Sequence, residues 1–169
     1  EDMYVQAMEH FPGVVIDRDQ RRIFVETGRF IDELVPVLDR WDDPGFFSPS
    51  LSPHSSYRRF MEADLSSYAA IRGQMMSPVS LGLKIMDEKG KPIVYNDEIR
   101  GFLFTFIQMK VNRQYHELKE KNRAAFVWLD DPGLEFIFSA LCGYDPVLAK
   151  REMSEFLDGL EGPRGIHLC

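Results

Sequence analysis

Two kinds of hydrophobic pattern alternate along the second part of the chain. Short apolar runs at 67–73, 124–129 and 165–169 predict strands, and longer stretches with apolar residues at helical spacing separate them. The longest stretch predicts a helix that Asn96 or Asp97 caps and that extends to about Lys121. Further helices are predicted over residues 134–141 and 145–160. Strands that alternate with helices in this way indicate βαβ units and therefore a parallel sheet.

The first third of the chain has a less regular pattern. Apolar runs at 14–16 and 23–25 predict a β-hairpin, and apolar spacing over 27–41 predicts a helix that contains Pro36. A short helix is predicted near 57–61. We therefore expect one α/β domain over residues 1–169, in which residues 1–66 form an irregular part with a helix and a hairpin and residues 67–169 form consecutive βα units.

Composition and charge exclude several classes of protein. The 169 residues include 20 basic and 27 acidic side chains, which gives a net charge of −7 and argues against a nucleic-acid-binding role. No apolar stretch reaches the roughly 18 residues of a membrane span. Two cysteines, Cys142 and Cys169, do not suggest a disulfide framework, and without a visible targeting segment they favour a cytoplasmic location. Cys142 is expected to pack rather than to bind metal.

Polar residues follow each of the three predicted parallel strands. Gln74 follows the first strand, Asp130 and Asp131 follow the second, and His167 and Cys169 lie on the third. Functional groups of α/β proteins gather where the carboxyl ends of their strands meet. We therefore expect a functional site at this edge of the sheet.

Two alternatives remain open at this site from the residues alone. His167 and Cys169 lie two residues apart on a strand, so their side chains leave on the same side and could form half of a four-ligand zinc site. Taken alone, an H-x-C pattern more often marks packed core residues, and its position at a strand end is what favours the metal site. Asp130 and Asp131 precede Pro132, so either carboxylate could hold a substrate amine, take part in proton transfer or cap the following helix.

Three motifs together resemble one enzyme family. Residues 73–80 (GQMMSPVS) resemble the G-x-x-x-G-P-[VI]-[ST] loop of cobalamin-independent methionine synthases, and residues 127–134 (VWLDDPGL) resemble their [IV]-D-E-P-x-L segment. Residues 165–169 (GIHLC) resemble the strand with their H-x-C zinc ligands. The resemblance covers about residues 67–169. Ser77 stands where the family usually has Gly, and Asp131 stands where it usually has Glu.

The resemblance implies a fold and an activity. The family belongs to a superfamily of (β/α)₈ TIM barrels that includes uroporphyrinogen decarboxylase, so the chain is expected to be part of such a barrel. His167 and Cys169 would be zinc ligands, and Asp130 and Ser77 would bind substrate. The implied reaction is zinc-dependent methyl transfer, in methionine biosynthesis, from methyl-folate or a methyl-corrinoid protein to a thiol such as homocysteine, with a homodimer as one possible assembly.

Other functions remain open, and the length adds one expectation. A uroporphyrinogen decarboxylase-like lyase would need an arginine cluster that Arg72 could join, and a non-catalytic paralogue would only bind a ligand or a partner. A complete barrel needs about 250 residues. The 169 residues are therefore predicted to be a fragment of a longer barrel. Alone, such a fragment is expected to be inactive and, because its sheet edges are exposed, to aggregate.

Overall fold

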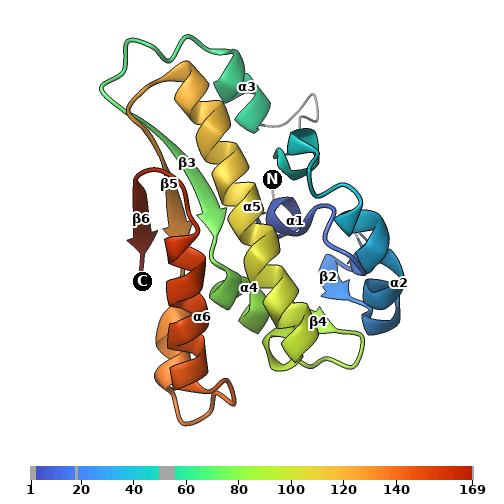
Figure 1. Cartoon of the computed structure of the whole chain (residues 1–169). Coiled ribbons are helices and arrows are strands. Elements are labelled where there is room, and N and C mark those ends of the chain that lie inside the picture. The colour runs from blue at the N-terminus through green and yellow to red at the C-terminus, as the bar shows by residue number, and fades with distance from the viewer. Residues whose placement is uncertain (1–2, 18, 50–55, 169) are drawn as a thin grey trace.

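Two three-stranded sheets lie on either side of one long helix, α5 (Figure 1). The structure is a computed structural model that describes residues 3–17, 19–49 and 56–168. The strands are β1 (Val14–Asp17), β2 (Arg22–Val25), β3 (Ile71–Met76), β4 (Met86–Asp87), β5 (Ala125–Asp130) and β6 (Arg164–His167). The α-helices are α1 (Met3–Met8), α2 (Thr27–Leu38), α3 (Ser56–Glu62), α4 (Pro78–Lys84), α5 (Asp97–Lys121) and α6 (Pro146–Asp158). The 3₁₀ helices are η1 (Pro44–Phe47), η2 (Ile93–Tyr95) and η3 (Leu134–Phe138).

The C-terminal sheet is parallel, with strand order β3-β5-β6, which confirms the predicted parallel α/β arrangement. Its first strand begins later than predicted, at Ile71 rather than at residue 67, and extends to Met76. The amide of Asn122 explains the late start, because Nδ2 donates to the carbonyl oxygens of Leu65 and Tyr68 at 2.9 and 2.8 Å. Those bonds hold the residues before Ile71 in a turn, so pairing with β5 begins at Ile71, opposite Ala125.

The two faces of this sheet differ in how they are covered. α5 packs against the face that carries Gly73, where a Cβ would lie 2.7 Å from Leu118 Cδ1 and 2.8 Å from the Gln114 amide. A residue with a side chain at this position would push the helix away from the strand. Along β5, buried residues alternate with half-buried ones. The strand is therefore fully buried on one face only within the described chain, although its residues are apolar on both faces up to Leu129.

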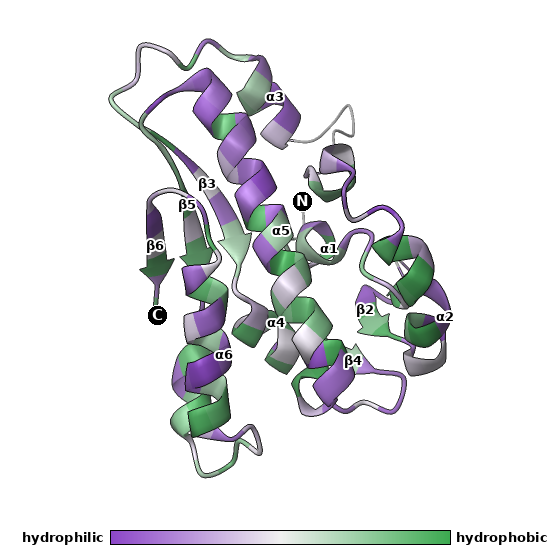
Figure 2. Cartoon of the chain, in the orientation of Figure 1, coloured by the Kyte–Doolittle hydropathy of each residue, from purple (hydrophilic) through white to green (hydrophobic). Residues whose placement is uncertain are grey.

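α5 is buried on two sides, although the sequence predicted a single apolar stripe. Leu118 and Gln114 face the parallel sheet, whereas the ring of Phe106 lies 5.4 Å from Phe11 and 5.6 Å from Phe47 of the N-terminal part. Figure 2 shows hydrophobic and hydrophilic residues alternating along α5. The helix thereby joins the irregular N-terminal part to the parallel sheet in one hydrophobic core.

The N-terminal sheet contains the predicted hairpin, in which β1 pairs antiparallel with β2. β4, which the sequence did not predict, pairs parallel with β2. The turn after β4 also supports α2, because the Glu88 carboxylate accepts hydrogen bonds from Thr27 N and Thr27 Oγ1 at 2.9 and 2.8 Å. These bonds lower the pKa of Glu88. Glu26, the residue that precedes the helix, makes no side-chain cap, so the cap of α2 comes from a segment 61 residues away.

The segment between β5 and α6 differs from its prediction as a helix over 134–141. It contains only the 3₁₀ helix η3, which ends at Phe138. Phe136, Phe138 and Leu141 are exposed, and Ile137 is the buried residue of η3. One buried position gives a longer amphipathic helix too little apolar contact to form.

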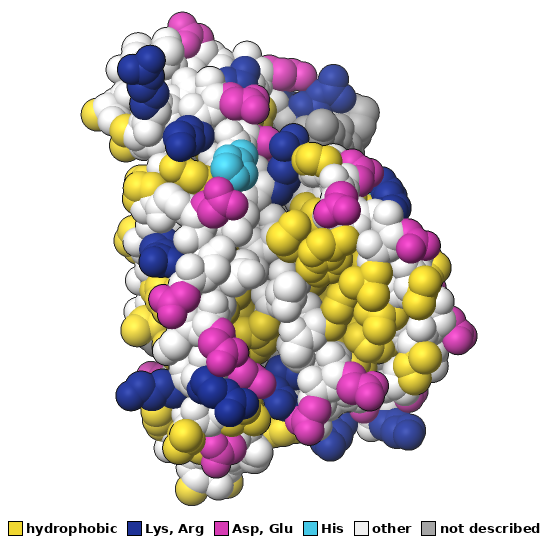
Figure 3. Space-filling view, viewed as in Figure 1, with side chains coloured by type: hydrophobic (Ala, Val, Ile, Leu, Met, Phe, Trp, Pro, Cys, Tyr) yellow, Lys and Arg dark blue, Asp and Glu magenta, His cyan; other side chains and the backbone are white. Residues whose placement is uncertain are grey.

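Hydrophobic side chains also gather on the surface. Figure 3 shows them over α2 and the neighbouring part of α5, with charged side chains spread around them. On α2, Ile31 and Val35 are 64% and 61% exposed. Within the described residues, no helix is both long and apolar enough to cross a membrane.

Candidate functional site

The strand register brings the three sequence motifs into one row. Met76 on β3 pairs with Asp130 on β5, and Asp130 pairs with His167 on β6. The backbone continues the ladder one step further, because Ser77 N donates to Asp130 O and Asp131 N donates to His167 O, both at 2.9 Å. The expected meeting of polar residues at the carboxyl edge of the sheet is therefore observed.

The Asp130 carboxylate is the centre of this row. His167 Nδ1 lies 3.1 Å from Asp130 Oδ1, and Gln74 Nε2 donates a hydrogen bond to Asp130 Oδ2. The Asp130 side chain is 16% exposed, whereas the His167 side chain is 51% exposed. Each of three adjacent strands thus contributes one polar side chain, and the imidazole is the most accessible member of the Asp130–His167 pair.

Trp128 forms an apolar wall beside these groups. Its indole lies 6.4 Å from the His167 ring, measured between centroids, and the Arg72 guanidinium lies 5.4 Å from the Trp128 ring. Gly165 leaves space for the indole, because a Cβ at that position would be 2.9 Å from Trp128 Cε3. The imidazole therefore has a carboxylate on one side and an aromatic ring nearby.

Ser77 and Asp131 lie at the same edge but inside the protein. Ser77 Oγ accepts a hydrogen bond from Val79 N at 3.1 Å and so caps α4. Asp131 Oδ1 accepts from Ser80 Oγ at 2.7 Å, and Ser80 Oγ accepts from Gly133 N at 2.8 Å. These bonds join α4 to the loop after β5. Both Ser77 and Asp131 are buried, so neither presents a side chain to solvent.

Burial raises the pKa of the Asp131 carboxyl, and the hydroxyls of Ser77 and Ser80 oppose that rise. The second carboxylate oxygen, Oδ2, is buried and accepts no hydrogen bond from the described residues. The cap position of η3 is occupied by Gly133, so neither aspartate stands there, although the backbone N–H of Leu134, the first residue of η3, helps to lower the pKa of the Asp131 carboxyl. Asp131 also connects α4 to the loop after β5, and Asp130 faces the accessible side.

The predicted zinc ligands are only partly described. His167 lies at the end of β6, and Cys169 lies outside the described residues. Among the residues that the structure does describe, no three His, Cys, Asp or Glu side chains are grouped closely enough to hold a metal ion. Cys142 is half-buried and its Sγ lies 3.9 Å from the Tyr95 hydroxyl, far along the chain from His167.

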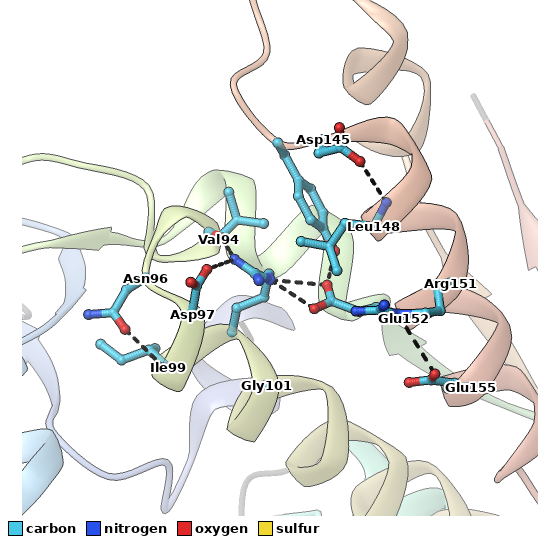
Figure 4. A network of polar contacts seen from close by, with 12 residues as sticks. Val94, Asn96, Asp97, Ile99, Gly101, Asp145, Leu148, Arg151, Glu152 and Glu155 are labelled. Carbon is cyan, nitrogen blue, oxygen red and sulfur yellow. Dashed lines mark hydrogen bonds and ion pairs between the residues drawn. The ribbon is translucent and has the colours of Figure 1, made fainter.

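A buried ion pair joins α5 to α6 (Figure 4). Arg100 Nε donates to both oxygens of Glu152 at 3.1 and 3.0 Å, and Arg100 Nη1 donates to Val94 O at 2.8 Å. Tyr144, which precedes α6, donates its hydroxyl to the same carboxylate. Burial and the hydrogen bond to Glu152 raise the pKa of Tyr144. The segment that follows Asp130 and Asp131 is thus anchored at its far end.

Sequence reasoning missed the roles of Gln74 and Trp128. It placed Gln74 in a connection after the strand, whereas the residue lies within β3 and its amide reaches Asp130. Trp128 counted only as an apolar strand residue. Alternation along the strands carried the missing signal, since Trp128 is two residues before Asp130 and Gln74 is two before Met76.

Comparisons of this chain with protein-family models, with curated proteins and with solved structures give no match.

Proposed function

We propose that this chain forms part of a zinc-dependent methyltransferase of the methionine synthase type. The observation that carries the proposal is the single row of Met76, Asp130 and His167, because it brings the three motifs that resemble this family to one sheet edge. A random coincidence of three short motifs would not require them to meet in space. The thiol acceptor would be homocysteine or a similar compound, and the methyl donor would be methyl-folate or a methyl-corrinoid protein.

The proposed architecture is a segment of a (β/α)₈ barrel. Strands β3, β5 and β6 are parallel and follow one another across the sheet in the order of the chain, with β4 of the other sheet between β3 and β5 in the sequence, and α5 covers one face of their sheet. Consecutive barrel units have this arrangement, with helices outside and the opposite sheet face inside. On that reading, Asp130 and His167 would lie at the mouth of the barrel, where active sites of this fold are found.

The described residues fit a zinc ligand at one position. A histidine that binds zinc usually donates its other ring N–H to a carboxylate or a carbonyl group. His167 has that second contact, since Nδ1 lies 3.1 Å from Asp130, and a metal bond would then fall to Nε2. Cys169 would be the second ligand, two residues further along. When bound, zinc lowers the pKa of a coordinated thiol and so supplies a thiolate nucleophile at neutral pH.

The chain's own residues would bind and orient the substrate. The Asp130 carboxylate can accept from the ammonium group of an amino-acid thiol, and its place beside His167 would hold the sulfur close to the metal. Ser77 would act through the backbone, because its hydroxyl caps α4 and its N–H holds the carbonyl of Asp130. A cytoplasmic location and a homodimer belong to the same proposal.

Zinc binding by the full chain tests the proposal. His167 and Cys169 would supply half of a four-ligand site, so we expect the purified chain to bind about one zinc ion, more weakly than a complete site, measured by metal analysis and by competition with a chelating dye. His167→Ala and Cys169→Ala should lose that ion. His116→Ala is the matched control, because His116 is also about half exposed and pairs with a carboxylate, Glu161, at 2.8 Å. Absence of zinc from the wild-type chain, or equal zinc in His167→Ala, would overturn the proposal.

A lyase of the uroporphyrinogen decarboxylase type is the second candidate. One observation favours it, since Arg72 lies on the same face of the sheet as Trp128 and could hold a substrate carboxylate. Such an enzyme needs several arginines that converge, and no second arginine of the described chain contacts Trp128. A chain that binds no zinc but binds a polycarboxylate in an Arg72-dependent way would support this candidate.

A further inference from the structure

We infer that Gln74 and Asp130 form a hydrogen-bond relay across three strands that fixes the tautomer and orientation of the His167 imidazole. The inference rests on the proposed zinc site for its purpose, but the relay itself is a property of the described residues. Gln74 would then be a positioning residue that acts on His167 through Asp130. Neither the motifs nor the resemblance assigned it any role.

The direction of each hydrogen bond follows from the chemistry of the three groups. A carboxylate has only acceptors, so the Gln74 amide must turn its NH₂ group, not its carbonyl oxygen, toward Asp130. The contact joins Gln74 Nε2 to Asp130 Oδ2. By the same rule His167 must donate from Nδ1 to Asp130 Oδ1, 3.1 Å away. The neutral imidazole therefore carries its proton on Nδ1, and the lone pair of the ring lies on Nε2.

The register of the sheet makes this relay rigid. Asp130 pairs directly with His167, and Gln74 lies on β3 opposite Trp128, two residues before the partner of Asp130. The amide thus reaches the carboxylate diagonally across the strands. Because Gln74 occupies Oδ2, the carboxylate plane cannot rotate freely about its own axis, and Oδ1 stays directed at the imidazole. A carboxylate held by one partner alone would keep that rotation.

Trp128 restricts the imidazole from a second direction. The indole lies over Gly165, where any Cβ would be 2.9 Å from Cε3, and its ring centroid is 6.4 Å from that of His167. The His167 ring therefore lies between an aromatic neighbour and a fixed carboxylate although its side chain is half exposed. Orientation of this kind is what a metal ligand needs, because a preset tautomer and rotamer reduce the ordering that binding requires.

The relay can be read directly in the metal-free chain. Long-range ¹H–¹⁵N NMR spectra distinguish the two imidazole tautomers, and the spectrum of His167→Ala assigns the His167 signals. We expect the Nδ1–H tautomer in the wild type, a mixture in Gln74→Met, and predominance of the Nε2–H tautomer in Asp130→Ala. Gln20→Met is the matched control, because Gln20 lies on the exposed turn of the hairpin and the same amide is lost. Its His167 signals should match those of the wild type.

Zinc affinity provides the second readout. Asp130→Ala should raise the zinc Kd about 10–100-fold, the range seen when outer-shell partners of metal ligands are removed. Gln74→Met should raise it by a smaller factor, and Gln20→Met should leave it unchanged. The relay is overturned if the Nδ1–H tautomer persists in both Gln74→Met and Asp130→Ala. It is also overturned if the wild type binds zinc and both variants bind it with the same Kd. If the tautomers respond as expected but the wild type binds no zinc, the relay stands and the proposed function fails.

Discussion

Two carboxylates at opposite ends of the parallel sheet perform different tasks because their partners differ. Near the end of α5, at the amino edge of the sheet, Glu117 accepts hydrogen bonds from Ser48 Oγ and Tyr57 OH and forms an ion pair with Arg113 at 2.8 Å. At the carboxyl edge, Asp130 contacts Gln74 and His167. The Glu117 and Asp130 side chains are similarly enclosed, at 13% and 16% exposed.

The two carboxylates differ in the burial of their partners and in the parts of the chain that those partners belong to. Ser48 and Tyr57 belong to segments that pack against α5. The Glu117 network therefore joins separate parts of the chain, and these parts cover the Glu117 carboxylate. Burial and the hydrogen bond to Glu117 raise the pKa of Tyr57, as expected of an enclosed phenol. The partner of Asp130 is instead a half-exposed imidazole. A carboxylate therefore stabilises the fold at one edge and presents an accessible ring at the other.

Removal of Glu117 should have the largest effect on stability. Glu117→Ala leaves the Tyr57 hydroxyl and the Arg113 guanidinium without their shared acceptor, so we expect the free energy of unfolding to fall by about 3 kcal/mol. Urea denaturation followed by circular dichroism measures this change. Glu120→Ala, an exposed residue on the same helix, should change stability by less than about 0.5 kcal/mol. Equal values for the two variants would remove the distinction between the edges.

Lys110 lies on α5 between the two edges and should control the pH dependence of stability. Burial lowers its pKa from 10.5 to about 8, against the attraction of Glu9, and Nζ donates to Gln6 O at 2.9 Å. Between these values the unfolded chain binds more protons than the folded one, so stability rises with pH in that window. We expect a gain of about 2 kcal/mol from pH 8 to pH 10.

Lys110→Met isolates this contribution, because it keeps the length of the side chain and removes the charge. The difference in unfolding free energy between wild type and variant, measured by urea denaturation at each pH, cancels the titration of the other groups. That difference should change in favour of the wild type from pH 8 to pH 10. A difference that is constant over this range would show that Lys110 titrates at its ordinary pKa or outside the window.

Removal of Asp130 should have the smallest effect on stability. Its partners are exposed or half-exposed and can bond to water instead, so Asp130→Ala should lower the free energy of unfolding by less than about 1 kcal/mol. The same urea assay measures it beside Glu117→Ala. A loss as large as that of Glu117→Ala would make Asp130 a structural carboxylate and would end the contrast between the two edges.

The sequence predicted the strand and helix types well because their hydrophobic patterns are local. The hairpin at 14–25, the long helix to Lys121 and the parallel strand at 124–129 follow from alternation and helical spacing, and Asn96 caps the long helix as predicted. Boundaries that depend on distant residues were missed. Asn122 delays the start of β3, and Glu88, in the turn after β4, caps α2.

The candidate site divides in the same way. Motifs and strand ends located Asp130 and His167 along the chain, because ligand-type residues after a buried strand are visible in a single sequence. The distinct tasks of the two neighbouring aspartates were not visible. Both precede Pro132, yet Asp130 faces the accessible side whereas Asp131 is buried against Ser80. Their side chains point to different surroundings because successive residues at the end of a paired strand face opposite sides of the sheet.

By itself, the sequence determined most of the elements, their order and the residue types at the strand ends; β4 and the short η3 were exceptions. Local spacing and capping preferences act within a few residues, and that information is complete in the chain. The tertiary structure decided which of those residues meet. Gln74 and His167 are 93 positions apart, and only the register of three strands brings both to the Asp130 carboxylate. Such contacts depend on strand pairing over long separations, which no local pattern specifies.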